Sequence, residues 1–186
     1  DWTVYDTFMT RNADRYTMYA VTLPGFGGSQ PPPSPPAGEP YTSGPWMANA
    51  ERAILDMMDQ KKLQKPVVLG QALGGHIAMR LMAHHGERIR AAVALNGMAA
   101  YTILGPSQPL VSKAQRSQYV DGFLTAKIKE ISDPDWLKQQ SEWIEQAVQD
   151  QDRAKALVEA AKGVPMAVSS RYLLEYLGAD IASRGG

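Results

Sequence analysis

The fold is decided by residues 66–78, which read PVVLGQALGGHIA. The run opens with a short apolar stretch, which suits a buried strand. It then turns through small residues and enters a helix that carries Ile77, Leu81 and Met82 on one side. This order of strand, glycine-framed turn and helix predicts a sharp turn that lifts one side chain above the edge of a sheet.

The turn has the glycines of the pattern Gly-x-Ser-x-Gly, which is typical of a nucleophile elbow, but it lacks the serine. Gly70 and Gly74 stand where larger side chains would clash, and the central residue is Ala72, which has no nucleophilic atom. In such an elbow the next backbone amide, here that of Leu73, and the amino terminus of the helix stabilise the oxyanion that forms. The stretch therefore indicates a site built for nucleophilic catalysis whose reacting atom is absent.

The chain has the length and composition of a neutral domain with a core. Its 186 residues are 44% apolar, and 19 basic residues balance 19 acidic ones. Zero net charge gives no electrostatic reason to expect nucleic acid or an anionic membrane as a partner, and no apolar run is long enough for a membrane span. The absence of cysteine excludes disulfides, thiolate metal sites and a cysteine nucleophile.

Strands and helices alternate in the first half of the chain. Residues 16–23, 67–69 and 91–95 are rich in strand formers, and an apolar stripe of helical period runs through residues 46–62. We expect residues 67–69 to form a central strand flanked by 18–22 and 91–95, all parallel and joined by right-handed crossovers. The chemistry of such a sheet lies at the carboxyl ends of its strands, where the elbow begins.

Residues 108–182 contain helical patterns only. Asp133 followed by Pro134 predicts a helix start, and Gly163 followed by Pro165 predicts the end of the next helix. Helices that follow a strand end, with no strand among them, indicate a lid over the carboxyl end of the sheet.

The chain resembles the α/β-hydrolase superfamily in three segments, LPGFGGS at 23–29, GQALGGH at 70–76 and VALNG at 93–97. The resemblance implies an α/β fold with a mainly parallel central sheet, of which this chain supplies the fourth to sixth strands, and an inserted helical cap. It places the core in residues 1–105 and the cap in residues 106–183. The other core strands, and the acid and histidine of a Ser-His-Asp triad, would then lie outside this segment or in a second chain that completes the sheet.

By the same resemblance, the substrate is a small-molecule ester or related acyl compound, and no metal or organic cofactor is implied. Ala72 takes the nucleophile position and Leu73 supplies the oxyanion amide. The residues that would contact the substrate come from the strand ends and the cap, and they are Gln71, Asn96, Met98, Trp136 and Trp143. Asn96 and Met98 also fit a purely structural role in the turn. The two tryptophans are seven residues apart and share a helical face, which favours packing within the cap.

Two classes of function fit these residues. An alanine in an otherwise intact elbow indicates a serine hydrolase that has been inactivated; a C–C hydrolase, a thioesterase and a cofactor-free haloperoxidase use the same elbow. Natural loss of the serine would instead leave a non-catalytic protein that binds a small apolar ligand. The three histidines, His76, His84 and His85, lie on the helix after the elbow, where we expect packing or surface roles rather than a triad base or a metal site. The resemblance also favours export, to the periplasm or beyond the bacterial cell.

Overall fold

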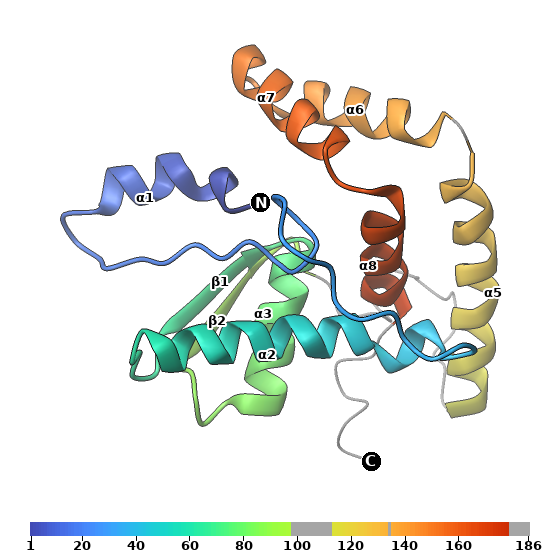
Figure 1. Ribbon diagram of the computed structural model, residues 1–186, viewed down its shortest axis with the longest axis horizontal. Helices are drawn as coiled ribbons and strands as arrows, with labels where there is room; N and C mark the ends of the chain where they lie inside the picture. The colour runs from blue at the N-terminus through green and yellow to red at the C-terminus, as the bar shows by residue number, and fades with distance from the viewer. Residues whose placement is uncertain (98–112, 134, 179–186) are drawn as a thin grey trace. The chain divides into compact units, whose positions relative to one another are not determined.

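A computed structural model of the protein describes residues 1–97, 113–133 and 135–178 (Figure 1). The chain folds into two compact units. One, the amino-terminal unit, consists of Asp1–Pro33 and Leu137–Val168. The other, the elbow unit, consists of Ser34–Trp136 and Ser169–Gly186, and it contains the stretch that decides the fold.

The elbow unit is built on two neighbouring strands, β1 (Val67–Gln71) and β2 (Ala91–Leu95), joined by helix α3 (Leu73–His85). The strands are parallel and pair in register along their whole length. A parallel pair needs a crossover connection, which α3 provides. The α/β class, the two strands and their parallel pairing are therefore confirmed.

Helix α3 covers one face of the strand pair. Alternate residues of a strand point to opposite faces, so each strand contributes two kinds of position. The positions on the α3 side are buried or half-buried, and they are Val68, Gly70, Ala92 and Ala94. The large apolar residues on the other side are exposed, and they are Val67, Leu69, Val93 and Leu95.

Among the described residues, three more helices belong wholly or mainly to the elbow unit, namely α2 (Pro45–Gln60), α5 (Lys113–Ile131) and α8 (Met166–Gly178). A short 3-10 turn, η2 (Tyr41–Ser43), precedes α2. The apolar stripe of α2 is buried as its helical period requires. The fully buried apolar side chains of this unit include Met47, Met58, Ile77, Leu81 and Tyr172.

A buried ion pair accompanies these apolar contacts between α2 and α3. The Arg80 guanidinium donates to a carboxylate oxygen of Glu51 over 2.5 Å, and each side chain is only 2% exposed. His84 lies 2.9 Å from the other oxygen of the same carboxylate. Because a buried charge is tolerated only when it is paired, these contacts fix how α2 lies on α3.

The amino-terminal unit holds η1 (Trp2–Tyr5), α1 (Asp6–Asn12), α7 (Gln151–Lys162) and nearly all of α6 (Trp136–Ala147). The Asp150 carboxylate caps α7 by accepting from the amides of Asp152 and Arg153. The Arg153 side chain donates to the carbonyl of Thr3 over 2.6 Å, which joins α7 to η1.

The strand predicted at residues 16–23 is wrong. This segment carries strand-forming residues, but the structure assigns it no strand, so the flanking position predicted for 18–22 is also wrong. A strand needs a partner for its amides and carbonyls, and the other described elements of the amino-terminal unit are helices and turns. Among the described residues the sheet therefore has two strands.

The helical character predicted for the second half of the chain is confirmed within the described residues, where residues 113–178 form α5 to α8 and no strand. Asp133 accepts from the amide of Asp135 ahead of α6, and Gly163 follows the last residue of α7, as predicted. These helices are divided between the two units, so a cap formed by residues 106–183 stays a prediction. No described helix combines the length and hydropathy that a membrane crossing requires.

Candidate active site

The backbone at Ala72 has the sharp turn that the sequence predicts. Ala72 lies between the last residue of β1 and the first residue of α3, with φ 48° and ψ −114°. An L-residue in this sparsely populated region stores about 1–3 kcal/mol of strain. The surrounding chain holds the turn from both sides, because the Ala72 amide donates to the carbonyl of Leu95 over 2.8 Å and its carbonyl accepts from the amide of His76 over 2.9 Å.

The glycines of the elbow allow backbone segments to approach closely. A Cβ atom on Gly70 would lie 2.1 Å from the carbonyl carbon of Gly74, and one on Gly75 would lie 2.9 Å from the Cα of Gly97. Only glycine fits at such distances. The first turn of α3 is therefore packed directly on the end of β1 and on the turn after β2.

Residues that follow the two strands meet at one end of the sheet. Gln71 ends β1, and Asn96 follows β2 with a positive φ of 51°. Since β1 and β2 are parallel and in register, both residues lie at the same edge as Ala72, and all three are exposed. Met98, the other residue predicted to contact the substrate at this edge, lies outside the described residues.

The arrangement suits the stabilisation of a developing negative charge. Leu73 is the first residue of α3, so its amide belongs to the positive end of the helix dipole. Ala72, at the amino-terminal cap position, supplies no side-chain hydrogen bond to the first turn. An oxyanion formed above residue 72 would face these amides.

The two tryptophans predicted for the substrate pocket lie in different environments. Trp136, at the start of α6, is 7% exposed, whereas Trp143 is 65% exposed. Trp136 is therefore packed against its neighbours and Trp143 is not, and the assignment of either residue to a cap stays a prediction. Trp136 belongs to the elbow unit and Trp143 to the amino-terminal unit, and their contact with a substrate stays a prediction.

The histidines take the packing roles that the sequence indicated. His76 is fully buried, with its ring edge-on to Tyr176 at a centroid distance of 5.2 Å. His84 contacts Glu51 and His85 lies beside it. No cluster of three or more potential ligands that could hold a metal ion occurs among the described residues.

The segment LPGFGGS forms a compact loop in the amino-terminal unit. The Ser29 hydroxyl accepts from the amide of Gly25 over 3.0 Å and donates to the carbonyl of Phe26 over 2.7 Å. Gly25 has φ 91°, and a Cβ there would meet Val168 at 2.8 Å. Ser29 is therefore the residue that closes this loop, a role for which the only sequence signal was its place in the motif.

A buried carboxylate lies near the start of α2, at a residue that the local sequence does not mark as functional. Glu175, on α8, accepts from the amides of Trp46 and Met47 and from Arg171. Burial raises the pKa of the Glu175 carboxyl above its usual value, and these donors oppose the shift. Burial also raises the pKa of the hydroxyls of Tyr172 and Tyr176, which keeps both neutral. No local pattern could have revealed Glu175, because its partners on α2 lie 128 and 129 positions away.

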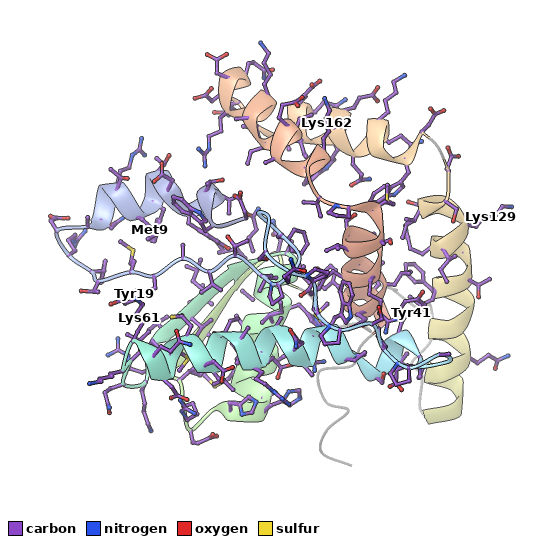
Figure 2. All side chains as sticks on the ribbon, viewed as in Figure 1. Met9, Tyr19, Tyr41, Lys61, Lys129 and Lys162 are labelled. Atoms are coloured by element: carbon purple, nitrogen blue, oxygen red, sulfur yellow. The ribbon has the colours of Figure 1, made fainter. Side chains whose placement is uncertain are left out.

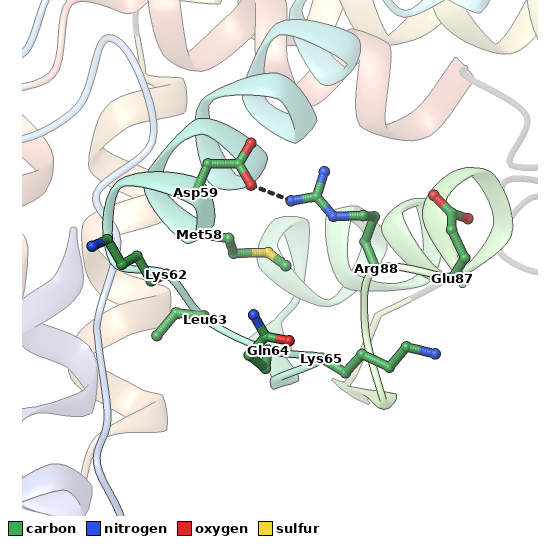
Figure 3. Close-up of a pocket in the computed structure, with 8 residues that line it drawn as sticks. All are labelled: Met58, Asp59, Lys62, Leu63, Gln64, Lys65, Glu87 and Arg88. Carbon is green, nitrogen blue, oxygen red and sulfur yellow. Dashed lines mark hydrogen bonds and ion pairs between the residues drawn. The ribbon is translucent and has the colours of Figure 1, made fainter.

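A separate groove of about 500 Å³ lies at the other end of the strands (Figure 3). Lys62 and Lys65 on its wall precede β1, and Glu87 and Arg88 precede β2, so the groove is at the amino ends of the strands. Arg88 is paired with Asp59 across it. Its lining mixes both signs of charge and holds no part of the elbow.

Comparisons with known proteins identify the fold family of the chain. The alpha/beta hydrolase fold family matches residues 5–162. Pimeloyl-[acyl-carrier protein] methyl ester esterase of Aeromonas hydrophila is 38% identical over 81 residues, which are 44% of this chain and 27% of that protein. The crystal structure of a hydrolase from Pseudomonas aeruginosa PA01 aligns with 97% of this chain and 59% of its own, with a TM-score of 0.55 and 19% identity.

This chain spans less than two thirds of the length of either relative. The family match nevertheless covers most of the chain, and it includes both strands and the whole of the elbow. The protein belongs to the alpha/beta hydrolase fold family.

Proposed function

We propose that the protein carries the active-site framework of a serine hydrolase for an ester or related acyl substrate, with Ala72 at the nucleophile position. The observation that supports this most directly is the backbone of Ala72, at φ 48° and ψ −114° between β1 and α3. Alanine makes no use of such a turn, since its side chain supplies no hydrogen bond to the first turn of α3. A nucleophile does use it, because the turn aims the side chain away from the sheet and toward the helix amides.

With serine at position 72, each step of ester hydrolysis has a place in this framework. The hydroxyl oxygen attacks the acyl carbonyl and passes its proton to a histidine, and the amide of Leu73 stabilises the oxyanion. The alcohol leaves with that proton, and water then releases the acid from the acyl-enzyme. We expect the histidine from outside this segment, because the three present here pack within helix α3 and its neighbours.

An ester is the preferred substrate class because the Aeromonas relative is a methyl ester esterase. Within this chain, Gln71 and Asn96 are the described candidates for contact with the substrate, since they flank Ala72 at the sheet edge. Trp136 and Trp143 would contact it only if the cap closes over this edge.

Ala72 itself supports a second function, which is binding without catalysis. Alanine keeps the turn, the Leu73 amide and the dipole of α3, but it offers no atom that could form an acyl-enzyme. Loss of a triad nucleophile lowers turnover by about a millionfold, or roughly 8 kcal/mol of activation free energy. The chain with alanine would therefore hold an ester without consuming it.

The deciding experiment is Ala72→Ser in the whole protein, with turnover of a short-chain p-nitrophenyl ester as the readout. We expect turnover to rise far above that of the alanine form and a fluorophosphonate probe to label residue 72. Gln71→Ser is the matched control, because it adds the same hydroxyl one residue away, outside the turn. If folded Ala72→Ser shows only background turnover and binds a product carboxylate as the alanine form does, the hydrolase proposal fails and the binding-protein proposal takes its place.

A further inference from the structure

Helix α2 begins without a cap of its own. The residue before it, Gly44, is in the left-handed conformation with φ 60° and has no side chain to offer. The amides of Trp46 and Met47 in the first turn donate instead to one oxygen of Glu175, over 2.7 and 3.0 Å. A carboxylate is well suited to this position, since it accepts the first-turn amides and faces the positive end of the helix dipole. Glu175 thus joins α8 to the beginning of α2.

The second oxygen of Glu175 is also occupied. Arg171, one turn earlier on α8, donates from Nε to this oxygen over 2.6 Å. The Arg171 guanidinium lies over the ring of Tyr41, 4.5 Å from its centroid. Tyr41 lies just before the start of α2 (Figure 2). The Glu175 side chain is completely buried, so its charge is held by a fixed set of donors rather than by water.

The same helix contacts the elbow. Tyr172 packs edge-on against Trp46 of α2, and Tyr176 packs edge-on against His76 of α3, each with a centroid distance of 5.2 Å. His76 is in the first turn of α3, and its amide is the one that donates to the carbonyl of Ala72. Helix α8 therefore contacts the first turn of α2 and the first turn of the elbow helix within one compact unit.

We propose that Glu175 is a positioning residue for the elbow: its carboxylate fixes α8 on the first turn of α2, and α8 fixes the first turn of α3 through Tyr176. Ionisation of Glu175 then sets the environment of the Leu73 amide, although the carboxylate contacts neither Leu73 nor Ala72. The importance of the Leu73 amide rests on the proposed function. The link between Glu175 and this amide does not, and it is measurable without catalysis.

The charged and titratable groups around Glu175 define what its ionisation can affect. The groups on α8 are Arg171, Tyr172 and Tyr176. Tyr41 of η2 is linked to Glu175 indirectly, because its ring lies under the Arg171 guanidinium. Further groups lie on α2 and α3, two of the helices that α8 contacts. They are Glu51 on α2 and His76, Arg80, His84 and His85 on α3. Glu51 is already paired with Arg80, and burial holds the tyrosines neutral. On protonation, Glu175 loses its charge attraction to Arg171 while its carbonyl oxygen can still accept from an amide.

The test is an acid titration of the 15N-labelled full chain, in which the amide resonances of Trp46 and Leu73 are followed together. We expect both to shift with one common midpoint, above the usual glutamate pKa, and Glu175→Gln to remove this step from both. Tyr176→Leu should keep the step at Trp46 and remove it at Leu73, because it removes the ring contact with His76 and leaves the Glu175 carboxylate and its donors in place. Glu87→Gln is the control, since Glu87 is exposed beyond the far end of α3 and its loss should leave both steps in place.

Persistence of the Leu73 step in Glu175→Gln, or its survival in Tyr176→Leu, would overturn the proposal. If Glu175→Gln does not fold, the Tyr176→Leu titration still decides the matter, because it leaves the carboxylate and its donors intact. These outcomes are independent of the Ala72→Ser experiment, so failure of the proposed hydrolase and failure of this link are distinguishable.

Discussion

The strained backbone at position 72 makes a quantitative prediction for Ala72→Gly. Alanine at φ 48° and ψ −114° stores about 1–3 kcal/mol, and glycine removes this cost because it has no Cβ. Glycine also adds about 0.4–1 kcal/mol of conformational entropy to the unfolded chain, which opposes the gain. As the residue that precedes α3, glycine is moderately better than alanine. The net expectation is a free energy of unfolding higher by about 0.5–2 kcal/mol.

Urea unfolding followed by circular dichroism measures this change, and thermal unfolding should show Tm raised by about 2–4 °C for each kcal/mol. Ala53→Gly is the matched control, because the same chemical change in the middle of α2 should lower stability by about 1 kcal/mol. A loss of stability in Ala72→Gly comparable to that in Ala53→Gly would refute the reasoning, since it would mean that the turn at 72 carries no strain to relieve.

The remaining predictions concern packing and buried charge. Gly70→Ala should lower the free energy of unfolding, measured in urea, by more than about 3 kcal/mol, because the new Cβ would lie 2.1 Å from the backbone of α3. The control is Gly122→Ala in α5, which has open space around it and should raise the free energy of unfolding by about 0.5–1 kcal/mol. Arg80→Leu should lower the free energy of unfolding by about 3 kcal/mol or more in the same assay, because the carboxylate of Glu51 loses its buried cation. The control is Arg52→Leu at an exposed position, and an Arg80→Leu loss smaller than the Arg52→Leu loss would contradict the importance of the buried pair. Burial raises the pKa of Glu175 in the folded state. The stability of the wild type relative to Glu175→Gln should therefore be greatest below the usual glutamate pKa and should fall as pH rises through the raised value. Urea unfolding midpoints of both proteins at several pH values measure this difference.

The elbow was predictable because its information is local. Gly70, Ala72 and Gly74 lie within one turn, and close approach of the backbone at Gly70 leaves no alternative residue. The strand at residues 91–95 was equally predictable. Its composition favours a strand, and the crossover through α3 brings it beside β1, where it pairs.

The strand predicted at residues 16–23 shows the limit of composition. Residues with high strand propensity favour an extended backbone, but a sheet also requires a second strand to pair with. The amino-terminal unit has no such strand among its described residues. Burial along α6 shows the same limit, since Trp136 and Trp143 occupy equivalent positions of one helix face and differ in what covers them.

The role of Glu175 could not be predicted from the local sequence pattern. In the sequence it is an ordinary charged residue in an apolar helix, and only the fold brings it to an uncapped helix 129 positions earlier in the chain. Buried charges that act across such separations depend on tertiary structure alone, and sequence periodicity would instead assign them to the surface.

The way in which the turn at residue 72 is held has a consequence for how this protein can evolve. Its hydrogen bonds run from the backbone of Ala72 to Leu95 and His76, and none of them depends on the side chain. Alanine and serine codons can differ by a single base, so residue 72 can change between them without disturbing the hydrogen bonds that hold the turn. Under the proposed function, ligand binding and turnover could then be selected separately on the same scaffold.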